Sequence, residues 1–309
     1  MAKDGPQGIS TARRDFLRFT GMGAAALTVG TKGLAAASPL AASGIGASAQ
    51  PATPAGPYNF LFILTDQERL FRPGELPPGF PLPGHERLKK AGTTFLNHRI
   101  ASCVCTSSRS VIYTGQHIQQ TKMFDNTNFP WIQSLDPDIP TVGDLLREAG
   151  YYTAYKGKWH LTKEFEEVNT LGSPTKIFTA EMEAYGFSDY FGIGDIIAHH
   201  EGGYRHDGIT TAMGSSWLRG KGRELAAKGK PWFLAVNLVN PHDVMFYDTD
   251  APGTPLRPPP GLSPLNRDPV DPLYAAQWNF DLPATHRQPL DQPGRPVAHT
   301  DYLRSHDAF

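Results

Sequence analysis

Polar, titratable residues follow three apolar runs of this sequence. Asp66 and Gln67 come directly after the first run, Lys158 and His160 after the second, and His242 after the third. Asp66 and Gln67 place two oxygen ligands side by side, which suits a hard cation such as Ca²⁺ or Mg²⁺. Lysine and histidine offer positive charge and transferable protons to an anionic, oxygen-rich substrate. These residue types together predict metal-assisted chemistry on an anion.

Cys105 stands at the start of a segment that favours anions. Ser107 or Ser108 can cap a short helix that Gly115 ends, and Cys105 would then lie at the positive N-terminus of that helix. Arg109 would follow one turn later and could contact the same anionic group. The segment therefore predicts a reactive cysteine with an arginine beside it.

Each of these residues also has a structural interpretation. Asp66 alone could be a helix cap or a turn residue, a single histidine is more often structural than catalytic, and Cys105 could pack as a small apolar side chain. Only Cys103 and Cys105 are available as cysteines. A cysteine-rich zinc site and a disulfide framework are therefore both excluded.

Three apolar runs, at 58–64, 151–155 and 232–239, predict the strands that must position these residues. The first run is nearly continuous, as is typical of a strand that is covered on both faces. Because the carboxyl ends of parallel strands form the ligand crevice of an open α/β sheet, we expect the polar residues to meet there. Lys158 and His160 alternate on an extended segment, so both side chains can point into one pocket.

Two helices are predicted between these strands. Thr141 can cap a helix that Gly150 ends, and residues 217–228 read as an amphipathic helix. The alternation of strand and helix predicts an α/β fold, a mostly parallel sheet with helices on both faces.

Composition excludes several other classes of protein. The 309 residues include 29 Lys+Arg and 30 Asp+Glu, which gives a net charge of -1. The sequence therefore lacks the excess of positive charge that indicates nucleic-acid binding. The 11% aromatic content excludes disorder throughout, and the glycines and prolines show no collagen period. No later segment approaches about 18 uninterrupted apolar residues, so we expect no stable membrane span.

Residues 1–49 are predicted to be a signal peptide. Arg13 and Arg14 precede a weakly apolar stretch, 21–29, and the small residues at 47–49 match a signal-peptidase site. Paired arginines before a weakly hydrophobic core indicate the twin-arginine translocase, which exports folded proteins to the periplasm or beyond. The alternative is a basic, disordered N-terminus.

Four short motifs occur in order between residues 58 and 245. They are Asn59–Asp66 (NFLFILTD), Cys105–Arg109 (CTSSR) with Thr114 and Gly115 after it, Gly157–Leu161 (GKWHL), and Asn240–Asp243 (NPHD). In residue type, order and spacing they resemble the signatures of the formylglycine-dependent sulfatases of the alkaline phosphatase superfamily.

The resemblance implies a sulfuric ester hydrolase that releases sulfate from a small-molecule or carbohydrate sulfate ester. Cys105 would be converted to formylglycine by a formylglycine-generating enzyme, and one hydroxyl of the hydrated aldehyde would attack sulfur. Arg109 and Lys158 would hold the diol and the sulfate oxygens. His160 would assist the return to the aldehyde, and His242 would protonate the departing alcohol.

The same resemblance implies the metal ligands and the choice of nucleophile. Asp66, Gln67 and Cys105 would bind a divalent metal, Ca²⁺ or alternatively Mg²⁺ or Mn²⁺. Cys105 is preferred over Cys103 because Arg109 follows it at the spacing of the family.

Two features depart from the family pattern. Ser107 stands where the family has proline or alanine, and neither the later Asp-His or Asp-Asn metal pair nor the later sulfate-contacting lysine has a match before Phe309. We therefore expect residues 50–309 to be the N-terminal part of a sulfatase catalytic domain, with little activity alone and without a terminal element. The stretch 251–300, which holds 12 of the 28 prolines, is predicted to be a loop. The alternatives are a phosphate or phosphonate ester hydrolase of the same superfamily, or a truncated, non-catalytic sulfatase-like chain.

Overall fold

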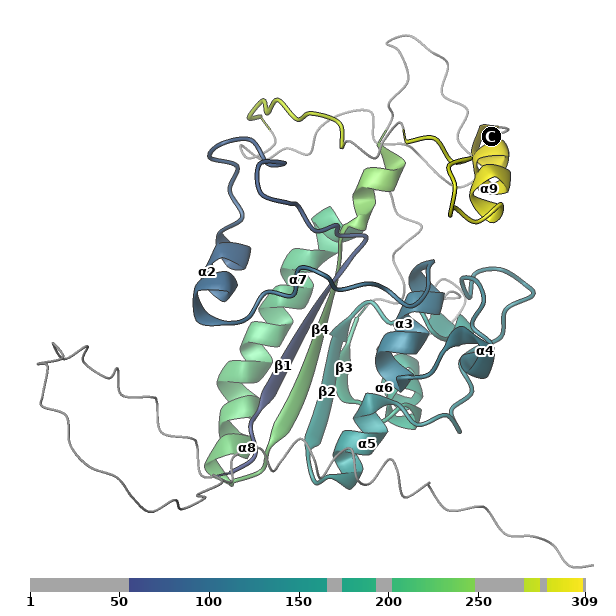
Figure 1. The fold of residues 1–309 in the computed structure, drawn as a ribbon. Coiled ribbons are helices and arrows are strands. Elements are labelled where there is room, and N and C mark those ends of the chain that lie inside the picture. The colour runs from purple at the N-terminus through teal and green to yellow at the C-terminus, as the bar shows by residue number, and fades with distance from the viewer. Residues whose placement is uncertain (1–55, 166–173, 193–201, 248–274, 284–287, 308–309) are drawn as a thin grey trace, which may run out of the picture. The chain divides into compact units, whose positions relative to one another are not determined.

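The computed structural model describes residues 56–165, 174–192, 202–247, 275–283 and 288–307 (Figure 1). All of them belong to the unit Pro54–Phe309. The predicted signal peptide, residues 1–49, lies outside the described residues, as does much of the predicted proline-rich loop. The assignment of residues 1–49 and 50–309 to separate roles therefore stays a prediction.

Four parallel strands form the sheet of the described chain, in the order β1-β4-β2-β3. They are β1 (Phe60–Asp66), β2 (Tyr152–Gly157), β3 (Ser188–Phe191) and β4 (Trp232–Pro241). β4 lies between β1 and β2, so that Ala235 is in register with Phe62 on one side and with Tyr155 on the other. The predicted parallel sheet is confirmed, and its three predicted strands are β1, β2 and β4.

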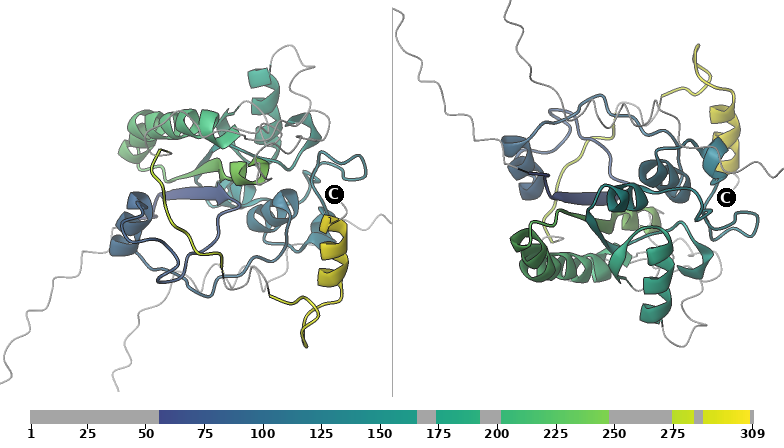
Figure 2. Two further views of the ribbon diagram at one scale, coloured as in Figure 1. Left: turned by 90° about the horizontal axis from the view of Figure 1, so that it is seen from above. Right: turned by 90° about the horizontal axis from the view of Figure 1, so that it is seen from below.

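Helices lie on both faces of this sheet, as predicted (Figures 1 and 2). The α-helices are α2 (Pro83–Ala91), α3 (Cys105–Thr114), α4 (Ile118–Thr121), α5 (Val142–Glu148), α6 (Pro174–Ala184), α7 (Gly202–Trp217), α8 (Arg223–Ala227) and α9 (Ala298–Asp307). Two short 3₁₀ helices, η1 (Lys163–Phe165) and η5 (His242–Phe246), and a π-helical turn, η4 (Leu218–Gly222), complete the set. None of the helices in the described part of the chain combines the length and apolar character that crossing a bilayer requires.

Successive side chains of a strand point to opposite faces of the sheet, so the strands contribute to two hydrophobic cores, one on each face. On one face, Tyr155 and Phe233 pack with Tyr113 of α3 and with residues of α6. On the other face, the strand neighbours Ala154 and Leu234 pack with residues of α7 and α8. The sheet is therefore the shared wall of both cores, which fixes where its strands end.

β1 differs from the prediction that its strand is covered on both faces. Phe62 and Leu64 pack against the first core, but Leu61 is 46% exposed and Ile63 is 52% exposed. The physical reason is position: β1 is the outermost strand of the described sheet, and α7 packs mainly against β4 and β2.

Helix predictions succeeded where capping residues mark the ends. Thr141 accepts hydrogen bonds from the N–H groups of Gly143 and Asp144, and the Asp144 carboxylate in turn accepts from the Thr141 N–H, which makes a capping box for α5. Gly150, just past the end of α5, has φ +89°, a left-handed conformation that glycine adopts readily.

Two other predictions were wrong in extent. The predicted helix 217–228 is the end of a helical run that begins at Gly202, because α7, η4 and α8 follow one another. The chain also has a terminal element, α9, after the proline-rich stretch. Between 275 and 297, the described residues of that stretch form no helix or strand, and α9 begins within it at Ala298, so the loop over 251–300 stays a prediction.

Candidate active site

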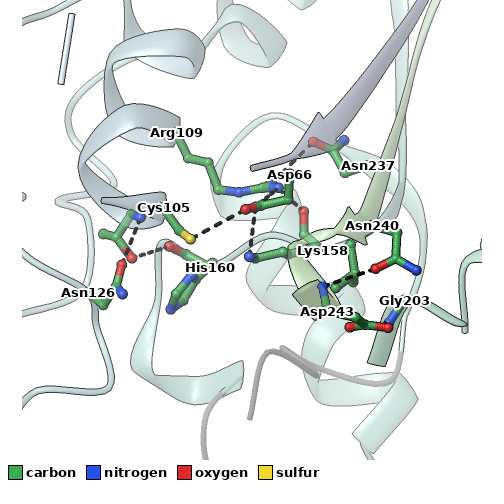
Figure 3. Close-up of polar contacts among 12 residues, drawn as sticks. Asp66, Cys105, Arg109, Asn126, Lys158, His160, Gly203, Asn237, Asn240 and Asp243 are labelled. Carbon is green, nitrogen blue, oxygen red and sulfur yellow. Dashed lines mark hydrogen bonds and ion pairs between the residues drawn. The ribbon is translucent and has the colours of Figure 1, made fainter. Parts of the chain in front are cut away.

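The polar residues predicted to meet at the carboxyl edge of the sheet are brought together there by the structure (Figure 3). Asp66 is the last residue of β1, Lys158 and His160 follow β2, and His242 begins η5 after β4. Cys105 approaches from the start of α3. Four segments far apart in the sequence thus supply one cluster.

Asp66 is the centre of the buried charge in this cluster. Its Oδ2 accepts hydrogen bonds from Arg109 Nη2 at 2.9 Å and from Lys158 Nζ at 2.7 Å. Burial alone would raise the pKa of Asp66, but the charges and hydrogen bonds of Arg109 and Lys158 hold that pKa well below its usual range. Asp66 is therefore a carboxylate that two cations share.

Arg109 is held on its other side by groups that sequence reasoning missed. Its Nη1 donates to the Lys158 carbonyl at 2.8 Å and to Asn237 Oδ1 at 3.2 Å. Tyr113 donates its hydroxyl proton to the same Asn237 oxygen at 2.7 Å. Burial alone would lower the pKa of Arg109, but the Asp66 carboxylate raises it above its ordinary value. The guanidinium is thus fixed in place and charged.

The turn after β2 aims Lys158 and His160 into the cluster, although the segment is not extended as predicted. Gly157 has φ +89°, and a Cβ atom at this position would overlap the main-chain carbonyl oxygen of Asn237. The Lys158 N–H donates to that same carbonyl at 3.1 Å. His160 also has a left-handed backbone, with φ +57°. The side chains of Lys158 and His160 therefore reach the cluster because Gly157 and His160 have left-handed backbones, and not because the two residues alternate along a strand.

Cys105 is the first residue of α3, as predicted, but the predicted cap is wrong. Val104 precedes the helix as its N-cap and makes no side-chain capping bond. The side chain of Ser107 is fully buried, and its hydroxyl has no hydrogen-bond partner among the described residues. Asn126 serves the helix start instead, because its Oδ1 accepts from the Thr106 N–H at 3.1 Å.

The Cys105 thiol touches three titratable side chains. Its Sγ lies 3.5 Å from Asp66 Oδ1, to which the thiol donates. Burial alone would raise the pKa of Cys105, but hydrogen bonds from His160 and His242, together with the charge of Lys158, lower it to about 6. The predicted reactive cysteine therefore has the environment that such a cysteine requires.

His242 is supported by the link between η5 and α7. Asp243 accepts hydrogen bonds from the N–H groups of Gly203 and Tyr204 at the start of α7, at 3.1 and 2.9 Å. The Asp243 N–H donates to Asn240 Oδ1 at 3.1 Å. The negative charge of Asp243 at the N-terminus of α7 stabilises this arrangement and fixes His242 beside it.

The donor atoms around Cys105 fit a divalent cation. Ligand atoms of Asp66, Cys105 and His242 all lie within 4.8 Å of one another. Nδ1 of His242 is buried and has no hydrogen-bond partner among the described residues. The three residues offer one oxygen, one sulfur and one nitrogen, whereas Ca²⁺ takes roughly 6–8 oxygens. As unmodified side chains they therefore make only part of a calcium site.

A cavity of about 470 Å³ opens beside this cluster. Gln67, the other predicted metal ligand, is exposed and lines this cavity together with Asp66 and Cys105. Cys103 is exposed and lines it as well, outside the group of ligand atoms. Both cysteines therefore line the cavity, but only Cys105 belongs to the group of possible ligand atoms with Asp66 and His242.

Residues 58–279 match the family model described as Sulfatase. The choline-sulfatase of Rhizobium meliloti (strain 1021) is 28% identical over 265 residues, which are 74% of this chain and 48% of that protein. The uncharacterized sulfatase YidJ of Escherichia coli (strain K12) is 35% identical over 107 residues, 33% of this chain and 20% of the other. The solved structure of BT1596, a 2-O GAG sulfatase, aligns with a TM-score of 0.43 at 19% identity, over 65% of this chain and 40% of that one. The chain thus spans about half the length of the choline-sulfatase it matches.

Proposed function

Because the chain belongs to the sulfatase family of the alkaline phosphatase superfamily, we propose that it carries the nucleophile and the anion-binding residues of a sulfuric ester hydrolase. One observation supports this proposal above the others. The Cys105 thiol lies between Asp66, His160 and His242, with two buried cations on the far side of Asp66. This is the environment of a nucleophile that works on an anion.

Cys105 is the position that we propose is converted to formylglycine. Conversion replaces the sulfur by oxygen, so positions 66 and 105 would both offer oxygen ligands, and His242 would stay available for proton transfer. Such a set is closer to the preference of Ca²⁺, with Mg²⁺ and Mn²⁺ as alternatives, and Gln67 is near enough in sequence to add a further oxygen. A bound divalent cation would supply positive charge that activates the nucleophile and neutralises the substrate.

The remaining residues bind the sulfate and move protons. Arg109 and Lys158 are buried cations that both pair with Asp66 Oδ2. We propose that they also attract the oxygens of a tetrahedral anion bound beside Asp66. His242 would donate a proton to the departing alcohol oxygen, and His160 would accept a proton at position 105. The substrate class is an organic sulfate ester, either a small molecule or a carbohydrate.

Burial of the signature residues constrains when conversion can occur. Thr106, Ser107 and Arg109, which follow Cys105, are all buried in the folded chain. A formylglycine-generating enzyme that reads these side chains must therefore act before folding is complete. Conversion in the cytoplasm, then export of the folded protein by the twin-arginine translocase to the periplasm, is the order of events that we propose.

Peptide mass spectrometry tests the assignment of the nucleophile. The chain is co-expressed with a formylglycine-generating enzyme, digested, and treated with a hydrazide probe that reacts with aldehydes. We expect the aldehyde in the peptide that carries position 105, its loss in Cys105→Ala, and its retention in the matched control Cys103→Ser. Intact thiol alone at 105, or an aldehyde at 103, would remove the centre of the proposed mechanism.

A panel of aryl sulfate and aryl phosphate esters tests the reaction class. The assay uses a version extended to the length of the choline-sulfatase relative, because we expect residues 50–309 to have little activity alone. Once converted, this longer version should hydrolyse the sulfates in preference to the phosphates, and Cys105→Ala should lose this activity. Faster turnover of the phosphates would instead assign a phosphoester hydrolase of the same superfamily, since tetrahedral anions share most contacts.

A further inference from the structure

One buried residue, Thr106, joins the three segments that surround the nucleophile. Its Oγ1 donates to the main-chain carbonyl of His160 at 2.8 Å and accepts from the Thr127 N–H at 3.3 Å. Its own N–H donates to Asn126 Oδ1 at 3.1 Å. Asn126 and His160 both lie beside the start of α3 at Cys105 (Figure 3). Thr106 therefore ties the first turn of α3 to both neighbouring loops.

The contact with His160 matters because of the backbone of that histidine. His160 has φ +57°, a left-handed conformation that is unfavourable for a residue other than glycine. Such a conformation persists only where its surroundings hold it. The Thr106 hydroxyl binds the carbonyl oxygen of His160 in this conformation, 54 residues away in the sequence. Figure 3 shows the His160 imidazole beside the Cys105 side chain at the start of α3.

We propose that Thr106 is a positioning residue, whose hydroxyl holds His160 against the side chain at position 105. The role assigned to His160 rests on the proposed function, but the positioning itself does not. Because Thr106 is the next residue after Cys105, the link through its hydroxyl fixes the His160 backbone relative to the nucleophile directly. Movement of the turn after β2 would otherwise separate the two groups.

Three variants of the unconverted chain test this proposal, all in a Cys103→Ser background that leaves Cys105 as the one thiol. Thr106→Val keeps the shape and removes the hydroxyl, whereas Thr106→Ser keeps the hydroxyl. Asn126→Ala is the matched control, because it removes the partner of the Thr106 N–H and leaves the bond to His160. Thr106→Ala replaces the valine variant if that variant does not fold.

Two measurements report on His160 without any need for catalysis. The first is the NMR signal of the ¹³C-labelled His160 ring and its nuclear Overhauser contact with the Cys105 β protons. The second is the rate at which iodoacetamide alkylates Cys105 at pH 5, below the pKa of the thiol, where the rate follows the thiolate fraction. In Thr106→Val we expect a shifted ring signal, a lost contact, and an alkylation rate lower by roughly three- to tenfold, the factor that one ordinary hydrogen bond is worth.

Thr106→Ser should restore both readouts, and Asn126→Ala should leave both close to wild type. The proposal is overturned if the ring signal and the rate in Thr106→Val equal those of the parent chain, or if Asn126→Ala changes them equally. Failure of the proposed function would show differently. It would remove the aldehyde or the ester hydrolysis and leave these measurements on the unconverted chain unchanged.

Discussion

Replacing Asp66 by asparagine should destabilise the folded chain strongly. The substitution keeps the size of the side chain and removes the negative charge that Arg109 and Lys158 share. Those two cations are 3% and 0% exposed, so water cannot solvate their charges in place. Removal of one partner from a buried ion pair typically costs about 3–5 kcal/mol. That is a large part of a total stability of about 5–15 kcal/mol.

Urea unfolding at pH 7, followed by tryptophan fluorescence in the presence of EDTA, measures this cost. With a slope of about 2 kcal/mol per molar urea, a loss of about 4 kcal/mol lowers the midpoint by about 2 M. Glu183→Gln is the matched control. It breaks an ion pair with Arg147 of the same length, 2.7 Å, whose side chains are 33% and 45% exposed. The expected cost of this control is about 0–1 kcal/mol.

Acid unfolding adds a second signature of the same residue. The pKa of Asp66 in the folded chain lies below the value of 3.8 that it has when unfolded. The stabilisation is therefore complete above about pH 4 and is lost as the pH falls toward the folded pKa. The stability difference between wild type and Asp66→Asn should shrink below pH 4. A midpoint for Asp66→Asn equal to that of Glu183→Gln would refute the account of the buried charges.

Three further predictions concern other parts of the chain. Ser107→Ala should raise the free energy of unfolding, measured with urea, by about 1 kcal/mol, because the buried hydroxyl has no hydrogen-bond partner among the described residues. A loss of stability would instead show that the hydroxyl makes a contact in solution. Burial raises the pKa of Tyr113 to about 12, so its stabilisation is lost as the pH rises from about 10 to 12, and Tyr113→Phe should lose less structure in that range by circular dichroism. Unchanged alkaline sensitivity of Tyr113→Phe would contradict this reason. Replacement of Arg13 and Arg14 together by lysine should hold the precursor in the cytoplasm on cell fractionation, and unchanged export would indicate general secretion.

The meeting of the site residues could be predicted because it follows from topology. Asp66, Lys158 and His242 each come after an apolar run, and parallel strands bring their carboxyl ends to one edge. Their supports could not be predicted in the same way. Asn237 lies inside an apolar run, and its contact with Arg109 spans 128 residues. The Thr106 hydroxyl binds the main-chain carbonyl of His160. Every residue has such a carbonyl, so nothing in the sequence indicates which one Thr106 binds.

The errors in the fold have local physical causes. α7 contains Gly202, Gly203, Gly208 and Gly214, and glycine is a poor helix former in isolation. Tertiary packing decides the outcome there, since Gly214 lies against Val236 of β4 where a larger residue would crowd it. The hydropathy of a sequence predicts where strands occur, but it does not predict their order in the sheet. It therefore could not reveal that β1 is an edge strand of the described sheet.

The position of β1 has a consequence for how the chain behaves in concentrated solution. Within the described residues β1 pairs with β4 on one side only, so the amide and carbonyl groups of its other edge are available to a second strand. The run Phe60–Leu64 (FLFIL) has no charge, proline or glycine, and Phe60, Leu61 and Ile63 are exposed. An uncharged, apolar edge of this kind is a template for intermolecular strand addition, because nothing in its composition opposes self-pairing. We therefore expect Ile63→Lys, which adds one positive charge to this edge, to lower any aggregation of the chain that proceeds through β1.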